Sequence, residues 1–129
     1  MTIHFGEHVM IDGYGGKKKS LDDRDFVYGA LYELPGKIGM KKMDDPVIYR
    51  AKPNGKKDPG GWSGFVVIQE SHISIHTFPG RGFISADVYT CKNGIDVKYV
   101  EKYFKKKFGL ADIELNFVKR GTRYPDGNI

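Results

Sequence analysis

The chain has 129 residues and a formal net charge of +5, with 40% hydrophobic and 13% aromatic residues. This composition excludes a disordered chain, and the length fits one domain, 1–129, that buries roughly two thirds of the surface of its unfolded state. No apolar run reaches the roughly 20 residues of a membrane span, and the start of the chain lacks the basic and then apolar order of a secretory signal, so we expect a cytoplasmic protein without a membrane partner.

The positive charge is carried by short lysine clusters at 17–19, 41–42, 56–57 and 105–107. Aromatic residues do not alternate with these lysines, as they do on surfaces that bind nucleic acid. We therefore expect solvated surfaces and no nucleic-acid partner. The single cysteine, Cys91, has no disulfide partner within the chain, which fits a reducing compartment.

The first half of the chain predicts a strand, a helix and a second strand. Residues 5–14 mix apolar and polar side chains before a glycine-rich turn and predict the first strand. Ser20 is expected to cap the helix, whose apolar residues recur at helical spacing until the Pro-Gly pair at 35–36 ends it. A weakly patterned second strand is expected within 37–49. The segment 53–61 is rich in glycine and proline and predicts an exposed loop.

The second half predicts further strands and one more helix. Residues 65–68 run directly into the polar stretch 70–79, and 81–91 forms another strand after a Pro-Gly turn. Residues 95–108 carry apolar side chains on one helical face and lysines on the other. The last expected strand is 113–118, which leads to a polar tail.

This order of elements predicts an α+β fold. Hairpin-length links between the middle strands favour an antiparallel sheet, with both helices on one face in a two-layer sandwich. Nothing inside the chain would then cover the other face of the sheet. We expect that face to be buried against a second copy, in a homodimer.

The stretch 70–79 carries more polar groups than a buried strand usually does. Alternation places Ser71 on one face with isoleucines and places His72 and His76 on the other, so Ser71 and His76 point apart unless the strand kinks or is interrupted at Ser71. Four strand residues span about 13 Å, too far for the two imidazoles to share one zinc ion, and further ligands at suitable spacing are missing. No metal site is expected.

Several motifs resemble the small prokaryotic S-adenosylmethionine decarboxylases. The matching residues are Gly6-Glu7-His8, Ser63-Gly64, Glu70-Ser71-His72, Ile75-His76-Thr77, Asp87, Thr90-Cys91, Arg120-Gly121 and Arg123-Tyr124. The sequence spacing from Ser71 to His76 and to Cys91 is that of the family. The resemblance extends over nearly the whole chain.

This resemblance implies an enzyme that makes its own pyruvoyl cofactor. In the family, the hydroxyl that matches Ser71 attacks the preceding carbonyl, here that of Glu70, and gives an ester. Elimination then leaves a dehydroalanine that becomes the pyruvoyl group. The chain is therefore expected to be cut into a segment 1–70 (β chain) and a segment 71–129 (α chain), with the pyruvoyl group at the head of the second.

The resemblance also implies roles for other residues. His76 matches the base of the processing reaction, and Ser63 matches a hydroxyl that holds the processing intermediate by hydrogen bonding. The pyruvoyl ketone derived from Ser71 takes the substrate amine as a Schiff base and accepts the electrons released when carbon dioxide leaves. Cys91 matches the acid that then protonates the substrate carbon. Phe78 matches an aromatic residue that stacks on adenine.

One position departs from the family pattern. Where the family usually has a glutamate that can hold the ribose hydroxyls, this chain has Gly80, followed by Arg81. Asp87 or a residue of a partner chain is a candidate replacement. The loop through Lys56 and Lys57 is also longer than the resemblance leads us to expect.

The resemblance thus implies the decarboxylation of S-adenosylmethionine, a small-molecule substrate, for the synthesis of the polyamine spermidine. Two alternatives stay open. The same pyruvoyl chemistry could serve arginine or ornithine, since a smaller cationic substrate needs no contact to a ribose diol. The chain could also be an unprocessed binding module that keeps the fold without the cofactor.

Overall fold

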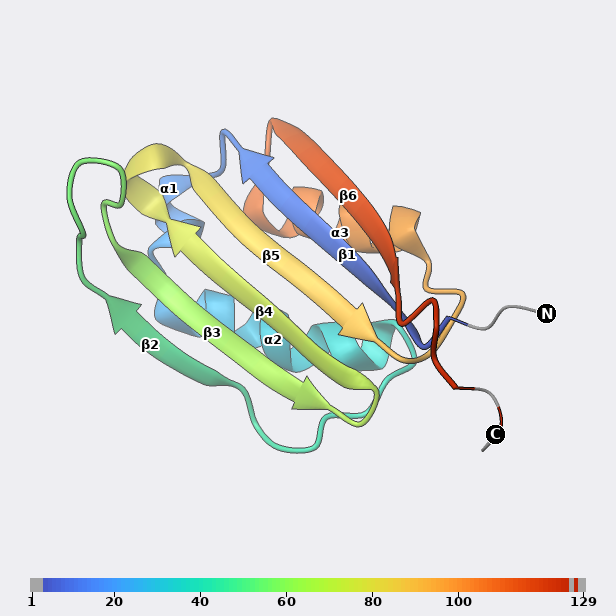
Figure 1. The fold of residues 1–129 in the computed structure, drawn as a ribbon. Coiled ribbons are helices and arrows are strands. Elements are labelled where there is room, and N and C mark those ends of the chain that lie inside the picture. The colour runs from blue at the N-terminus through green and yellow to red at the C-terminus, as the bar shows by residue number, and fades with distance from the viewer. Residues whose placement is uncertain (1–3, 126, 128–129) are drawn as a thin grey trace.

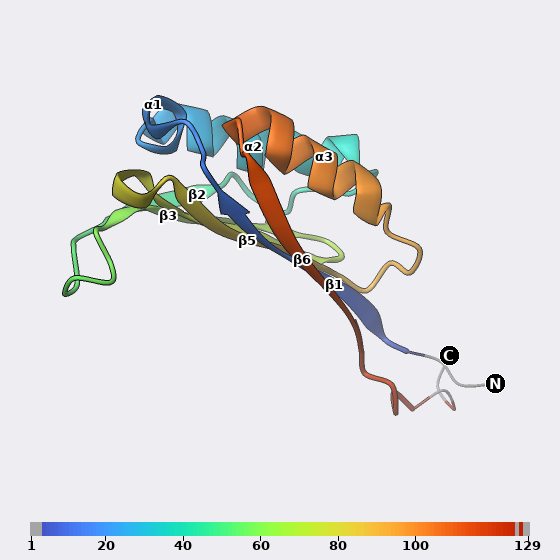
Figure 2. The same ribbon diagram turned by 90° about the horizontal axis from the view of Figure 1, so that it is seen from above.

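The computed structural model describes residues 4–125 and 127. Within them, one antiparallel sheet of six strands is covered on one face by helices (Figures 1 and 2). The sheet order is β2-β3-β4-β5-β1-β6. The strands are β1 (Gly6–Tyr14), β2 (Val47–Ala51), β3 (Gly61–Ile68), β4 (Ser71–Phe78), β5 (Phe83–Thr90) and β6 (Asp112–Arg120). The helices are α1 (Lys18–Leu21), α2 (Arg24–Lys37) and α3 (Val97–Phe108), with a 3-10 turn η1 (Pro79–Arg81).

The hydrophobic core lies between the sheet and the helices. Alternate residues of the central strands point into it, and the apolar stripes of α2 and α3 meet them there. The most buried members are Val9, Ile11, Leu31, Leu34, Ile73, Ile75, Ile84, Val88, Phe104 and Phe108. The expected two-layer α+β fold with helices on one face is confirmed. No helix in the described ranges is long and apolar enough to cross a membrane.

The predicted boundaries of the first long helix were wrong at both ends. Ser20 lies inside the short helix α1, and Asp23 caps α2 by accepting a hydrogen bond from the Phe26 N–H at 3.1 Å. At the other end, α2 continues through Pro35 to Lys37. A proline in the last turn removes only one helical hydrogen bond, and its buried ring packs into the core, so the helix ends only after it.

The strand expected to run from 65 into 70–79 is a hairpin. β3 ends at Ile68, two turn residues follow, and β4 begins at Ser71. The turn is fixed from outside the hairpin, because the Gln69 N–H donates to the Lys41 carbonyl at 2.8 Å. The interruption that the polar pattern called for therefore lies directly before Ser71.

The remaining elements agree with the sequence to within a few residues. The second strand is displaced from the range 37–49 to Val47–Ala51, and residues 53–57 of the predicted loop are exposed. Helix α3 begins after Asp96, whose carboxylate accepts the Tyr99 N–H at 3.0 Å. The last strand is longer than expected. Of the polar tail, residues 126 and 128–129 lie outside the described residues, as do residues 1–3 at the start of the chain.

A close backbone contact fixes the end of β4 that lies far from Ser71. Gly61 has φ +156°, and a Cβ there would lie 1.9 Å from the Thr77 carbonyl oxygen, so only glycine fits. The buried Thr77 hydroxyl donates to the Leu21 carbonyl at 2.8 Å and accepts the Trp62 N–H at 3.1 Å. Strand β4 is thereby anchored both to β3 and to α1.

A buried carboxylate anchors the loop between β5 and α3. Glu7 is 6% exposed, and its Oε1 accepts the N–H groups of Gly94 at 3.0 Å and Ile95 at 3.1 Å. Its Oε2 lies 3.1 Å from Nε2 of His4. Burial alone would raise the pKa of Glu7, but the hydrogen bonds from Ile95, His4 and Gly94 outweigh it and lower the pKa below its ordinary value.

Glu7→Gln should therefore lower the free energy of unfolding by about 1–3 kcal/mol at neutral pH, because charged acceptors form the stronger hydrogen bonds. A lowered pKa in the folded protein gives stability that is present above the ordinary pKa of a glutamate and lost as pH falls through the folded value. Urea unfolding of both proteins between neutral and acidic pH measures this. Their difference should shrink on acidification, and a constant difference would contradict the assigned role.

Candidate active site

Ser71 has an unusual backbone conformation. It begins β4 directly after the turn residues Gln69 and Glu70, and its φ of 151° is the one positive φ among the described non-glycine residues. That region is sparsely populated for residues with a side chain, and occupying it costs on the order of 1–3 kcal/mol. The strain lies next to the 70–71 peptide bond, which is the bond expected to be cut.

The carbonyl group of that peptide bond is held by a hydrogen bond. The Glu70 carbonyl oxygen accepts the backbone N–H of Cys91 at 2.8 Å. Ser71 pairs with Thr90 in the ladder between β4 and β5, so Cys91 follows directly on the neighbouring strand. The structure therefore brings Glu70, Ser71 and Cys91 together. An N–H group at the carbonyl stabilises negative charge that develops on its oxygen when the carbon is attacked.

Ser63 and His76 form a second group on the open face of the sheet, which is the face opposite the helices. They are direct partners in the β3–β4 ladder, and the Ser63 Oγ lies 2.8 Å from Nδ1 of His76. The imidazole is exposed. The pair is thus accessible from the side of the molecule that faces the viewer in Figure 1.

The two groups are far apart within one chain. His76 follows Ser71 by five residues in a continuous strand, which corresponds to about 16 Å. The unbroken pairing of β4 with β5 keeps the alternation, so Ser71 falls in line with the buried Ile73 and Ile75 while His76 points to the open face. Within this pairing, positions 71 and 76 therefore belong to opposite faces of the sheet.

Phe78 lies still farther from Ser71, at the last position of β4. It pairs with Phe83, and the two ring centroids are 5.6 Å apart. Over seven strand residues its distance from Ser71 is about 23 Å. Seven residues were proposed from the sequence, and they fall into two groups. Glu70, Ser71 and Cys91 gather at the start of β4, whereas Ser63, His76 and Phe78 lie in its second half or beside it. Asp87 lies between the two groups on β5.

A cluster around Asp87 was not predicted from the sequence. Nε2 of His8 lies 2.5 Å from Asp87 Oδ2, Nε2 of His72 lies 3.5 Å from the same oxygen, and the Ser74 hydroxyl donates to Oδ1. Arg120 lies 3.5 Å from the other ring nitrogen of His8. These contacts depend on the non-local pairing of β1 with β5, which no local pattern encodes. In the sequence, only the motif Gly6-Glu7-His8 indicated that β1 carries residues of the site.

The cluster raises the question of a metal. The ligating atoms of His8, His72 and Asp87 all lie within 4.8 Å of one another, so they could hold an ion. Histidines that bind metals usually donate their distal N–H to a carboxylate or a carbonyl. Here the distal nitrogen of His8 faces the guanidinium of Arg120, which is itself a donor. The arrangement therefore favours a carboxylate held by imidazole and hydroxyl groups over a metal centre.

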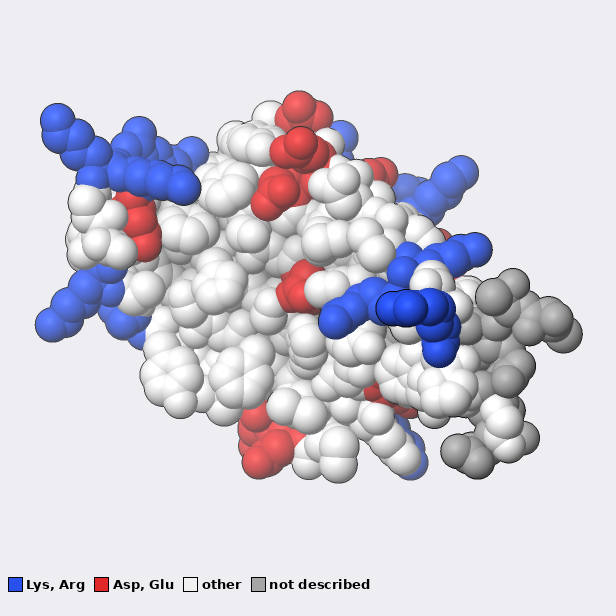
Figure 3. Space-filling view, in the orientation of Figure 1, with Lys and Arg blue, Asp and Glu red and all other residues white. Residues whose placement is uncertain are grey.

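The open face is hollowed beside this cluster. A cavity of about 390 Å³ is lined by His8, Met10, Asp12, Ser74, His76, Ser85, Ala86 and Asp87. Around it, Tyr49, Phe65, Val67 and Val118 are between 41% and 63% exposed. Figure 3 shows that much of this face carries no charged side chain, while lysines and arginines gather towards its ends. Exposed apolar surface of this extent is typical of an interface.

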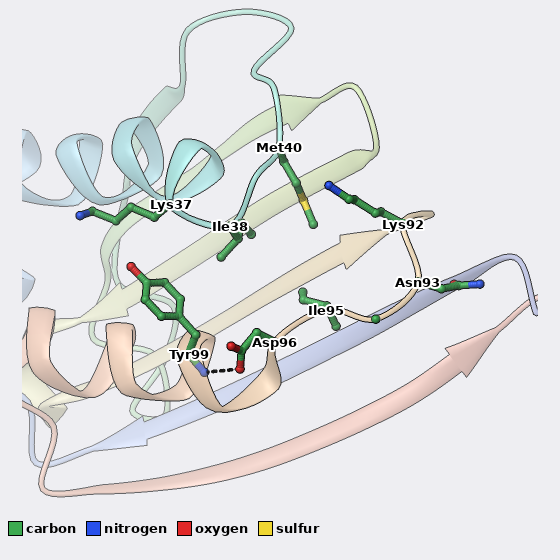
Figure 4. Close-up of a pocket in the computed structure, with 9 residues that line it drawn as sticks. Lys37, Ile38, Met40, Lys92, Asn93, Ile95, Asp96 and Tyr99 are labelled. Atoms are coloured by element: carbon green, nitrogen blue, oxygen red, sulfur yellow. Dashed lines mark hydrogen bonds between the residues drawn. The ribbon is translucent and has the colours of Figure 1, made fainter.

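Another cavity, of about 340 Å³, lies on the helix side of the sheet (Figure 4). It is formed between the end of α2 and the start of α3, and its lining includes Lys37, Lys92, Ile95, Asp96 and Tyr99. None of the seven candidate residues lines it. This cavity is connected to the candidate residues only through the loop that follows Cys91. That loop forms part of the lining and is held by the Glu7 carboxylate.

The fold and the candidate residues are those of a small α+β enzyme. Comparison with known proteins specifies the class: the profile of a family described as S-adenosylmethionine decarboxylase matches residues 7–121. The chain belongs to this family.

Similar proteins agree with that assignment. The S-adenosylmethionine decarboxylase proenzyme of Clostridium botulinum strain Hall is 30% identical over 116 residues, which cover 90% of this chain and 94% of the relative. The proenzyme of Clostridium kluyveri is 31% identical over 116 residues, or 90% and 86% of the two chains. Among solved structures, the adenosylmethionine decarboxylase of Aquifex aeolicus superposes with a TM-score of 0.77 at 26% identity, covering 92% of each chain.

Proposed function

We propose that this chain is a proenzyme that cuts itself before Ser71, forms a pyruvoyl group there, and decarboxylates S-adenosylmethionine for polyamine synthesis. One observation carries the proposal. The carbonyl of Glu70 accepts a hydrogen bond from the N–H of Cys91, at a peptide bond next to a serine with strained backbone. The backbone groups of Glu70, Ser71 and Cys91 therefore lie together at one end of the sheet.

The first step is attack of the Ser71 hydroxyl on the Glu70 carbonyl carbon. The acyl group moves from nitrogen to oxygen, so an ester replaces the amide, and the Cys91 N–H is placed to stabilise the charge on the oxygen during this transfer. Loss of the Ser71 α-proton then expels the Glu70 carboxylate. Water completes the reaction by releasing ammonia, and the second segment begins with a ketone at position 71.

Both steps need a base, and His76 has the right chemistry but the wrong place within one chain. An imidazole titrates near neutral pH and suits proton removal. The His76 of the same chain, however, lies about 16 Å away along β4. The Ser63 hydroxyl that contacts it is equally remote from Ser71. The geometry therefore supports a site that is completed by a second copy.

A two-fold axis between two stacked open faces resolves the distance. If the axis lies between the two sheets, perpendicular to β4 and level with its middle, strand direction is reversed from one protomer to its partner. The Ser71 end of one β4 then lies opposite the His76 end of the partner's β4, so the 70–71 peptide bond faces the end of the strand that carries the partner's imidazole, and each dimer contains two equivalent sites. This packing also buries the exposed side chains Tyr49, Phe65 and Val67.

The second reaction uses the same groups after the cut. The pyruvoyl group would supply a ketone that binds an amine covalently and withdraws electrons as carbon dioxide leaves. The backbone of Cys91 is hydrogen-bonded to the residue before it, and the Cys91 thiol is the proposed donor of a proton to the substrate carbon that has lost the carboxylate. The loop after Cys91 is held by Glu7, which restrains the chain that follows the cysteine. The named relatives favour this substrate over arginine or ornithine.

Intact mass of the purified protein tests the cut. The chain of 14.6 kDa should appear as two fragments that separate between residues 70 and 71. Ser71→Ala should remain one species, because no hydroxyl is present to attack. Ser74→Ala is the matched control on the same strand and should still be cut. A single uncut species of the unsubstituted chain would instead support the binding-module alternative.

Mixed dimers test whether the site is shared. Ser71→Ala and His76→Ala chains should each stay uncut alone, since a positioned base contributes about 100-fold or more to proton transfer. Expressed together with different tags, the His76→Ala chain should be cut, because its partner supplies the imidazole. The control partner carries both substitutions and should give no cut. Failure of the Ser71→Ala and His76→Ala pair to complement would rule out a shared site.

Substrate identity is measured by release of carbon dioxide from carboxyl-labelled compounds. Processed protein should release it from S-adenosylmethionine and not from arginine or ornithine. Cys91→Ser should remain cut but turn over at least about 100-fold more slowly, because a hydroxyl is a much poorer acid than a thiol. Faster release from either amino acid would replace the proposed substrate with that compound.

A further inference from the structure

A trough runs between α2 and α3 on the helix side of the sheet. It consists of the cavity of about 340 Å³ at the start of α3 and of an adjoining cavity of about 530 Å³, and both are lined by Lys37 and Tyr99. Figure 4 shows the ring of Tyr99 extending from α3 towards α2. The two cavities together are called the helix trough. The larger one is lined by Phe26, Glu33, Lys37, Tyr99, Lys102, Tyr103, Lys106 and Lys107.

The carboxylate in the larger cavity, that of Glu33, is already engaged within the chain. Its Oε1 accepts the hydroxyl of Tyr103 at 2.5 Å and lies 3.0 Å from Nζ of Lys107. The hydrogen bond from Tyr103, together with Lys107, outweighs the effect of burial and lowers the pKa of Glu33 below its ordinary value. Glu33 and Lys107 therefore compensate each other and tie α2 to α3.

Three other lysines of the helix trough have no such partner. Among the described residues, no carboxylate lies within 4 Å of the ammonium groups of Lys37, Lys102 and Lys106, and all three side chains are exposed. Lys102 and Lys106 are four residues apart on α3, where like charges repel each other. The carboxylate of Asp96 in the smaller cavity accepts the Tyr99 N–H at 3.0 Å. The helix trough therefore carries positive charge that the chain leaves uncompensated.

Apolar groups lie between these cations. The ring of Phe26 packs against Phe108 at 5.6 Å between centroids, and Tyr99 is 38% exposed on the opposite wall. Ile38 and Ile95 line the end of the helix trough next to the loop after β5. Solvated lysines alone would form a flat charged surface, whereas here they border a hollow with an apolar floor. Such a hollow is complementary to a chain that carries both carboxylates and an apolar side chain.

We propose that the helix trough binds a short acidic segment of another protein, whose carboxylates pair with Lys37, Lys102 and Lys106 and whose apolar side chain lies against Tyr99. Tyr99 and Lys106 are seven residues apart on α3, which corresponds to about 10 Å. About three or four residues of an extended segment cover this length.

The same cations could attract a single strand of nucleic acid, but the aromatic rings favour a peptide. Stacking of successive bases needs rings whose faces are free. The ring of Phe26 is covered by Phe108 and by Lys107, whose ammonium lies 4.7 Å from its centroid. Tyr103 is partly buried and its hydroxyl is bonded to Glu33. Tyr99 is therefore the one exposed ring among the aromatic residues that line the helix trough.

The helix trough is accessible whether the chain is single or paired. The proposed two-fold packing covers the open face of the sheet, and the helices lie on the other face of each protomer (Figure 2). The assignment does not depend on the proposed reaction, because none of the residues proposed for that reaction lines the helix trough.

Fluorescence anisotropy of a dye-labelled peptide, with four glutamates around one phenylalanine, measures binding to the full chain. The variant with both Lys102→Gln and Lys106→Gln should bind about fivefold more weakly or worse at low salt, because two exposed ion pairs are lost. The difference should shrink as salt is added, since exposed charges are screened. Glutamine is a good helix former, and removing a like-charged pair relieves repulsion, so the variant should keep its fold.

The matched control is the variant with both Lys18→Gln and Lys19→Gln. These lysines are exposed on α1 and lie outside the helix trough, so the same loss of charge should leave peptide binding unchanged. Tyr99→Ala should weaken binding without any change in net charge. Tyr32→Ala, which removes a 51% exposed tyrosine of α2 outside the helix trough, should not.

Equal losses in the two double variants, or no binding of the peptide, would overturn the assignment. An oligouridylate that binds more tightly than the peptide and depends on Lys102 and Lys106 would replace the protein partner with a nucleic acid and overturn the proposed occupant. Sedimentation that shows assembly beyond a dimer, abolished by the same two substitutions, would assign the helix trough to a second copy and also overturn it. The release of carbon dioxide tests the proposed reaction independently of these results.

Discussion

The central constraint of this structure is that β4 is hydrogen-bonded to a neighbour along both edges. Pairing with β3 and with β5 leaves no freedom of register, so the side chains of β4 must alternate between the core and the open face. Ser71 and His76 differ in parity and are five residues apart, and no small adjustment of the backbone brings them together. The distance between Ser71 and His76 is thus a property of the sheet, and the proposed reaction therefore requires the His76 of a second copy.

The polar groups of the open face fit the same conclusion. A face that is covered by a second copy, as the proposed function requires, cannot leave charges unpaired, since a buried unpaired charge is strongly destabilising. The carboxylate of Asp87 is accordingly surrounded by side chains from two neighbouring strands, β1 and β4, and His8 is contacted in turn by Arg120 from β6. Apolar side chains such as Phe65 and Val67 stand beside this network. The face combines satisfied polar groups with exposed apolar surface, as interfaces do.

Local patterns in the sequence predicted the fold class, most strands and the two long helices, because alternation and helical spacing are short-range signals. These local patterns failed to predict the boundaries of elements that are determined by contacts between residues distant in the sequence. The hairpin turn before Ser71 is fixed by Lys41, and α2 passes Pro35 because the core accepts the ring. The site residues came from a motif resemblance, which located the reacting groups but not their separation in space. The cluster around Asp87 needed the pairing of β1 with β5, which only the folded chain shows.

The division between strands and loop bears on what a motif can locate. The residues proposed to react lie on strands or directly after one, at fixed spacing, as Ser71, His76 and Cys91 do. Loops tolerate more variation than strands, and the connection between β2 and β3 is such a loop. The bond from Arg81 to the Lys56 carbonyl fixes this loop against η1. Gly80 lies in η1, so the position that departs from the family pattern lies beside the loop whose length also departs from it.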